Sequence, residues 1–163
     1  MKPNCTTDEF NSCMEVLKHI KHVKRCLEII ITGLEVRGNL HDASKMEDPE
    51  LATFAEYTPK LKTTTYGSED YMKFLEEMKP ALDHHGARNR HHPEHFTNGV
   101  DGMNLIDLVE MICDWKAATL KHNDGNILKS LEFNAKRFNL SPQLLSILKN
   151  TVELFEIIDE LKD

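Results

Sequence analysis

Hydrophobic residues recur along most of the chain at the three- and four-residue spacing that one face of a helix requires. No stretch shows the strict alternation of a half-buried strand. In the first helical stretch, the positions expected to face inward include Phe10, Cys13, Leu17, Ile20, Leu27, Ile30 and Leu34. The pattern therefore predicts an all-α fold, a compact bundle of about six helices that forms a single domain over residues 1–163.

Capping signals place the ends of the first two predicted helices. Thr6 with Glu9 three residues later predicts a capping box at the start of the first helix. This helix is expected to end near Val36, before the sequence RGN. Asp48 is expected to cap the second helix, with Pro49 at its first helical position.

The later elements follow from the same kind of signal. A loop is expected over residues 58–67, and Ser68 after it is expected to cap a third helix that Pro80 kinks. A polar loop is expected over residues 86–102. The remaining helices are expected over residues 103–122, 127–138 and 142–161, with a turn at 123–126.

One His of the first predicted helix lies on its apolar side. His19 falls in line with Val16, Val23 and Ile30, which predicts that it points inward. His22 falls among charged residues and is expected to face water. A single inward His is more often a hydrogen-bonded core residue than a metal ligand, so His19 is informative only together with other candidates.

An acidic stripe lies on the helix predicted over residues 103–122. Asp107, Glu110 and Asp114 share one face with methionine and alanine side chains. A charge stripe usually faces solvent, but these apolar neighbours indicate partial burial, and a buried carboxylate needs a partner. The stripe is compatible both with a solvated face and with carboxylates that pair with a metal ion or a His.

Five of the nine His lie between residues 84 and 95. The candidate segments are the pairs His84–His85 and His91–His92, and the separate dipeptide His41–Asp42. Neutral imidazole is the commonest protein metal ligand. Such segments can supply the ligands of one or two divalent first-row ions, and a set without Cys favours Mn, Fe, Co, Ni or Zn.

Basic residues are interleaved with these candidates. Lys45 lies four residues after His41, and Arg88 and Arg90 lie between the two His pairs. Beside a metal ion, such cations are favourable mainly when an anionic ligand such as phosphate joins the site. The alternative is that they are solubilising surface charges.

Charge and composition exclude several function classes. The net charge of −7 argues against binding to a nucleic-acid backbone. No apolar run approaches the roughly 18 residues of a membrane span, and the first ten residues lack the apolar centre of a signal peptide. We therefore expect a cytoplasmic protein without membrane association. The four Cys form no C-x-x-C pair and are expected to be buried, reduced thiols.

In their order, these motifs resemble those of the HD-domain superfamily of metal-dependent phosphohydrolases. HIKHV (19–23) is similar to its H-x-x-x-V segment, HDASK (41–45) to its H-D-x-x-K/E motif, and CDWKAAT (113–119) to its final Asp segment. The His pair at 91–92 resembles the extra pair of branches that bind more than one metal. HHGARNRHHPEHF and MNLIDLVEMICDWKAA are also similar to small phage and bacterial proteins of this kind.

The resemblance spans about residues 19–119 and implies an HD-like helical bundle with a defined ligand set. The metal ligands would be His19, His41, Asp42 and Asp114, with further ligands from one of His84 and His85 and from one or both of His91 and His92. Asp42 would also be catalytic, because it would bridge two ions or orient water.

The hypothesis assigns roles to the other candidates around this ligand set. Asp107 or Glu110 would orient a His ligand or act as general acid. Lys45, Arg88 and Arg90 would bind the substrate phosphate, and Lys45 would stabilise its charge during the reaction.

The expected function is hydrolysis of a phosphate ester in a small anionic substrate, a nucleotide. Two alternatives stay open. The same ligands suit a di-iron oxygenase, or a non-catalytic module that binds a nucleotide or a protein and keeps the metal as a structural pin. The last predicted helix carries more apolar residues than one stripe needs, which favours core packing over a homodimer seam.

Overall fold

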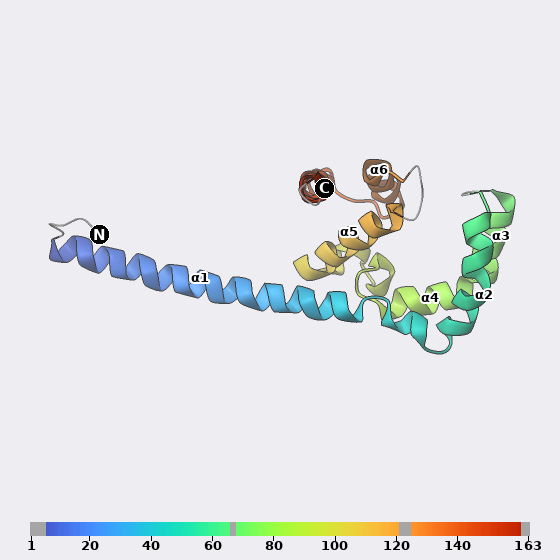
Figure 1. The fold of residues 1–163 in the computed structure, drawn as a ribbon, viewed down its shortest axis with the longest axis horizontal. Coiled ribbons are helices and arrows are strands. Elements are labelled where there is room, and N and C mark those ends of the chain that lie inside the picture. Colours follow the sequence, from blue (N-terminus) through green and yellow to red (C-terminus); the bar gives the residue numbers. More distant parts are fainter. Residues whose placement is uncertain (1–5, 66–67, 121–124, 161–163) are drawn as a thin grey trace. The chain divides into compact units, whose positions relative to one another are not determined.

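The computed structural model describes residues 6–65, 68–120 and 125–160, and within these ranges all regular structure is helical. The all-α prediction is therefore confirmed (Figure 1). The chain divides into two compact units, residues 1–39 and residues 40–163. A single domain, as predicted, would require the two units to pack together, so the single-domain assignment stays a prediction. Every helix in the described ranges is too short or too polar to span a bilayer.

The first unit is formed by helix α1 (Thr7–Leu40). Its predicted capping box is confirmed, because the Thr6 amide donates to Glu9 Oε2 at 2.8 Å and the Glu9 amide donates to Thr6 Oγ1 at 3.2 Å. The predicted end near Val36 is wrong, since the helix continues through Gly38 to Leu40. A single Gly costs a helix only about 1 kcal/mol relative to Ala, which is too little to end it.

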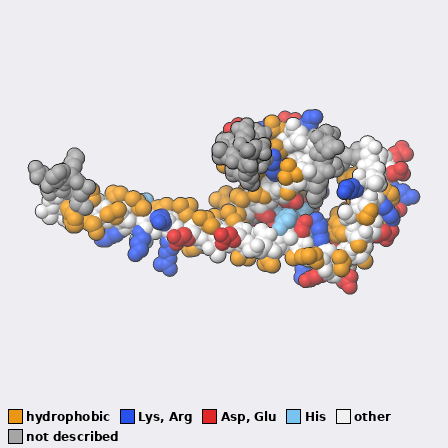
Figure 2. All heavy atoms as spheres, viewed as in Figure 1, with side chains coloured by type: hydrophobic (Ala, Val, Ile, Leu, Met, Phe, Trp, Pro, Cys, Tyr) orange, Lys and Arg blue, Asp and Glu red, His pale blue; other side chains and the backbone are white. Residues whose placement is uncertain are grey.

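Taken by itself, α1 buries none of its residues. Side chains that were expected to face inward, such as Ile20 and Leu27, are 47% and 55% exposed. Figure 2 shows hydrophobic side chains along the length of this helix. A lone helix has no second surface on which to bury an apolar face, so the predicted inward positions find no core within this unit.

The second unit begins with the short 3₁₀ helix η1 (Ala43–Met46), followed by α2 (Glu50–Thr63). The prediction that Asp48 caps α2 is wrong, because Pro49 occupies the N-cap position and no side chain caps the helix. The predicted loop over residues 58–67 is also partly wrong, since α2 continues through Pro59. Hydroxyl groups of Thr63 and Thr64 close its last turn by donating to the Lys60 carbonyl.

Helices α3 (Glu69–Glu77) and α4 (Lys79–Arg88) follow. The predicted cap is confirmed, because Ser68 Oγ accepts from the Tyr71 amide at 3.2 Å. The predicted kink is a break between two helices, with Pro80 in the first turn of α4, where a missing amide hydrogen removes no helical bond. The segment after α4, expected as a loop, contains the 3₁₀ helices η2 (Pro93–His95) and η3 (Gly99–Gly102).

The main core lies between α5 (Leu105–Thr119), α6 (Ile127–Arg137) and α7 (Pro142–Glu160). Each helix contributes two buried side chains, which are Met111 and Ile112, Ile127 and Leu131, and Leu148 and Val152. The predicted core role of the last helix is thus confirmed for Leu148 and Val152. Part of the turn predicted at 123–126 lies outside the described residues, as does the end of the helix predicted to residue 161.

The thiols differ from expectation in their exposure. Cys13, Cys26 and Cys113 are free, as predicted; Cys113 is exposed rather than buried, and Cys13 and Cys26 are exposed on α1 taken by itself. Cys113 lies on α5 next to the buried Ile112 in the sequence and is not part of the main core. Cys5 lies outside the described residues.

Candidate metal centre

Polar side chains from several elements of the second unit converge beside η1. His41 and Asp42 immediately precede η1, and Asp42 adopts the left-handed conformation with φ of 56°. Asp tolerates this conformation better than most residues, so the chain can turn there. His85 comes from α4, His91 and His92 lie between α4 and η2, and Asp114 comes from α5.

Two groups among the described residues have the composition and spacing to hold a metal ion. The first contains Asp42, His85, His91 and His92, and the second contains His41, His91 and Asp114. Within each group the ligand atoms lie within 4.8 Å of one another. His91 belongs to both groups, so the two candidate positions are adjacent. Figure 2 shows His and acidic side chains gathered at one place on the visible face.

Three atoms of the first group are buried and make no hydrogen bond within the described part of the chain. These atoms are Asp42 Oδ1, His85 Nε2 and His91 Nε2. Asp42 Oδ1 lies 3.1 Å from His85 Nε2 and 3.5 Å from His91 Nε2, although neither pair is aligned as a hydrogen bond. A buried polar atom without a partner costs roughly 1–3 kcal/mol. One cation among these atoms would satisfy all three, so the donor set fits a metal ion.

Carboxylates contact the Nδ1 atom of three of the four candidate His ligands, His41, His85 and His91. Glu110 Oε1 lies 2.9 Å from His41 Nδ1 and 3.1 Å from His91 Nδ1. Glu50 Oε2 lies 2.8 Å from His85 Nδ1. A ring that donates its Nδ1 hydrogen to a carboxylate keeps Nε2 unprotonated and available to a metal. Glu110 therefore lies where the hypothesis of an orienting carboxylate requires it.

Sequence reasoning did not identify Glu50, which is completely buried at the start of α2. Its Oε1 also accepts from His84 Nδ1 at 2.7 Å, and its Oε2 from Ser44 Oγ at 3.0 Å. Of the first His pair, the structure thus brings His85 into a candidate group and directs the Nδ1 atom of His84 to Glu50. The DPE sequence signalled only a helix start, and nothing in it distinguishes a buried carboxylate from an exposed one.

Electrostatics keep the candidate ligands in distinct protonation states. Burial raises the pKa of Asp42, but the neighbouring His85, His91 and Lys45 outweigh it and hold that pKa well below its usual range. Burial lowers the pKa of His92 to about 3, and the adjacent His91 contributes to the shift. Asp42 is therefore ionised and His92 neutral, which are the forms that bind metals.

His41 behaves differently in the metal-free protein. Its hydrogen bond with Asp114 raises its pKa, burial lowers it, and Glu110 adds to the rise, so that the pKa reaches about 9. Burial raises the pKa of Asp114, but His41 and His91 outweigh it and lower that pKa. A proton on His41 therefore competes with a cation in the second group near neutral pH.

The basic candidates lie in three different settings. Lys45 Nζ donates to Asp42 Oδ2 at 2.6 Å, while its side chain is 35% exposed, so its ammonium group borders the first group. Arg88 is exposed at the end of α4. Arg90 donates to both oxygens of the buried Asp107, at 3.1 and 2.9 Å.

Asp107 also forms the capping box of α5 with Asn104. The ion pair of Asp107 with Arg90 therefore belongs to the start of α5, and neither residue is in a candidate metal group. Their predicted roles in catalysis and phosphate binding stay predictions.

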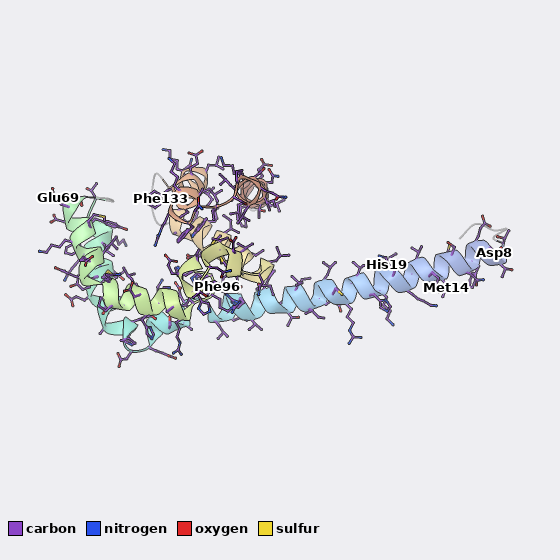
Figure 3. The ribbon with its side chains drawn as sticks, turned by 180° about the vertical axis from the view of Figure 1, so that it is seen from behind. Asp8, Met14, His19, Glu69, Phe96 and Phe133 are labelled. Atoms are coloured by element: carbon purple, nitrogen blue, oxygen red, sulfur yellow. The ribbon has the colours of Figure 1, made fainter. Side chains whose placement is uncertain are left out.

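His19 lies on α1, in the first unit, where it is exposed (Figure 3). It is in neither of the two groups, both of which lie in the second unit. His19 was expected to point towards a core, but the first unit, taken by itself, has none. Its role as a metal ligand stays a prediction.

A family model matches residues 8–154, which is most of the chain. The chain belongs to DUF5662, a family of unknown function. Every residue of the two candidate groups lies within the stretch that the DUF5662 model matches. Comparison with curated proteins and with solved structures returned no significant match.

Proposed function

We propose that this DUF5662 protein is a metal-dependent phosphohydrolase that cleaves a phosphate ester of a small anionic substrate, a nucleotide. The proposal is carried by two adjacent groups of ligand atoms that share His91. In these groups the Nδ1 atoms of His41, His85 and His91 face buried carboxylates. The resemblance of HDASK and the later Asp segment to HD-domain motifs supports the same chemistry.

The two groups would hold one or two divalent first-row ions from Mn, Fe, Co, Ni and Zn. An ion held there would supply Lewis acidity and would lower the pKa of a coordinated water molecule towards neutrality. Glu110 keeps His41 and His91 oriented. Lys45 is the cation best placed to contact a substrate phosphate, because its ammonium group is partly exposed beside Asp42.

Metal analysis coupled to a phosphate-release screen tests this function. The purified protein is incubated with nucleoside mono-, di- and triphosphates and phosphodiesters in the presence of Mn, Co, Ni or Mg. We expect the protein to contain a first-row metal and to release phosphate from at least one nucleotide. His41→Ala and Asp42→Ala are each expected to lower both the metal content and the rate.

His22→Ala serves as the control, because it removes a His of α1 that is outside the candidate set. Unchanged metal content in His41→Ala and Asp42→Ala would contradict the assigned ligands. Metal binding without turnover of any phosphate ester would exclude the hydrolase. Iron-dependent oxygen uptake with an organic substrate would then favour the oxygenase alternative.

A further inference from the structure

Glu50 is an acidic residue in an unusual position. It lies at the first residue of α2 and its side chain is completely buried. Burying a carboxylate is expensive unless hydrogen-bond donors or cations surround it. Three side chains do so here, since His84 Nδ1, His85 Nδ1 and Ser44 Oγ lie 2.7, 2.8 and 3.0 Å from its oxygens.

The donors around Glu50 come from the segments that carry the candidate ligands. Ser44 is in η1, two residues after Asp42, and His84 and His85 are in α4. Asn89 adds a further link, because its Nδ2 donates to Ser44 Oγ at 2.8 Å and to the His85 carbonyl at 2.9 Å. Through these hydrogen bonds, Glu50 connects α2 with η1 and α4, next to the first group of ligand atoms.

The His85 ring lies between two carboxylates, those of Glu50 and Asp42. Its Nδ1 atom faces Glu50 Oε2 at 2.8 Å, and its Nε2 atom is buried 3.1 Å from Asp42 Oδ1 without making a hydrogen bond. If the ring hydrogen lay on Nε2, Nδ1 could accept from Asn89 Nδ2 at 3.0 Å or from Ser44 Oγ at 3.2 Å, but its lone pair would also face the Glu50 carboxylate at 2.8 Å. The short distance to the carboxylate is favourable only when the hydrogen is on Nδ1.

We propose that Glu50 is a positioning residue of the metal centre, which fixes His85 with its hydrogen on Nδ1 and directs its Nε2 atom beside Asp42. This inference rests on the metal site of the proposed function, but not on the reaction assigned to it. His84, His85 and Ser44 together offer hydrogen-bond donors to both oxygens of Glu50, which is the arrangement that suits a carboxylate.

Glu50→Gln tests the proposal with a change that preserves shape. The amide retains one oxygen, but its NH2 group cannot accept a hydrogen bond from a ring. We expect the affinity for Mn²⁺ or Co²⁺, measured by competition with a chelator, to fall by about 10–100-fold. Glu56→Gln is the matched control, because Glu56 is an exposed residue of the same helix that pairs with Lys60, and we expect it to leave the affinity unchanged.

If Glu50 only stabilises the fold, the Glu50→Gln variant will give a different result. In that case Glu50→Gln would lower the melting temperature but leave the metal affinity of the folded protein unchanged, and the proposal would be overturned. Nitrogen NMR of the His rings in the metal-free wild type is a second measurement, because it reports which ring nitrogen carries the hydrogen. A hydrogen on Nδ1 of His85 supports the proposal, and a hydrogen on Nε2 overturns it, even if Glu50→Gln does not fold.

The two proposals can fail separately. If the wild type binds metal and Glu50→Gln weakens that binding, but no phosphate ester is hydrolysed, the inference about Glu50 stands and the proposed reaction falls. If phosphate release is observed while Glu50→Gln binds metal as tightly as the wild type, the reaction stands and the inference falls.

Discussion

Carboxylates contact the Nδ1 atoms of four rings in the His cluster, which leaves the Nε2 atoms of these rings as the candidates for binding a cation. One oxygen of Glu110 lies within 3.1 Å of the Nδ1 atoms of both His41 and His91, and Glu50 does the same for His84 and His85 through its two oxygens. These contacts separate the members of the first His pair. The Nε2 atom of His85 is buried beside Asp42, whereas the ring of His84 lies outside both candidate groups.

His85→Ala and His84→Ala are therefore expected to differ in their affinity for a metal ion. His85→Ala removes a ligand atom, and we expect the affinity for Mn²⁺ or Co²⁺ to fall by at least about 10-fold. His84→Ala removes only one donor to Glu50 and should have a smaller effect. Equilibrium dialysis of both variants measures the difference. A larger loss in His84→Ala than in His85→Ala would reverse the assignment within this pair.

At the scale of elements, the position of α5 controls the second group of ligand atoms. This helix carries Glu110 and Asp114, and its first turn is held by the capping box of Asn104 with Asp107. Arg90 joins the same turn through two hydrogen bonds to Asp107, and it stands next to His91 in the sequence. The start of α5 and the segment that carries the shared ligand are thus connected directly.

Asn104→Ala tests the contribution of this cap. The variant removes the side-chain oxygen that accepts from the Asp107 amide at 3.0 Å. We expect the free energy of unfolding to fall by about 1 kcal/mol, as for other N-cap replacements. Urea unfolding of the metal-free protein measures it. Asn98→Ala is a suitable comparison, since Asn98 is the N-cap of η3 but makes no side-chain capping bond there, and an equal loss in both variants would argue against the assigned cap.

For the second unit as a whole, protonation of His41 would compete with the binding of a cation at the second candidate group. His41 has a pKa of about 9 in the folded, metal-free protein, against an ordinary value of 6.5. A raised folded pKa stabilises the protein fully below the ordinary value, and this stabilisation is lost as the pH rises through the folded value. Metal affinity follows the opposite trend, because the imidazole must lose its proton before it binds the ion.

The contribution of His41 gives a testable pH dependence. With a chelator present, we expect the thermal stability of the protein to fall as the pH rises from 6.5 to about 9. His41→Ala is expected to lose this part of the dependence. Without the chelator, added Mn²⁺ or Co²⁺ should raise the melting temperature, and more strongly at the upper end of this range. Equal pH profiles for the wild type and His41→Ala would contradict the assignment.

Local signals in the sequence predicted elements well where one or two residues decide the outcome. The caps at Thr6 and Ser68 are confirmed, while the kink predicted at Pro80 is instead a break between α3 and α4. Predictions were wrong where a local signal was weaker than the helix around it, as at Gly38 in α1 and Pro59 in α2. A Gly inside a helix costs about 1 kcal/mol and a Pro about 3 kcal/mol relative to Ala, which the neighbouring turns and their packing can outweigh.

The sequence by itself determined the all-α class and the residue types of the candidate centre, because helical spacing and a concentration of His and Asp are properties of the chain alone. Only the tertiary structure decided which of them meet. His41 and Glu110 are separated by 69 residues and Glu50 and His85 by 35, so their pairing depends on how α2, α4 and α5 pack. Glu50 shows the difference most clearly, since its burial arises from that packing and leaves no mark on the local sequence.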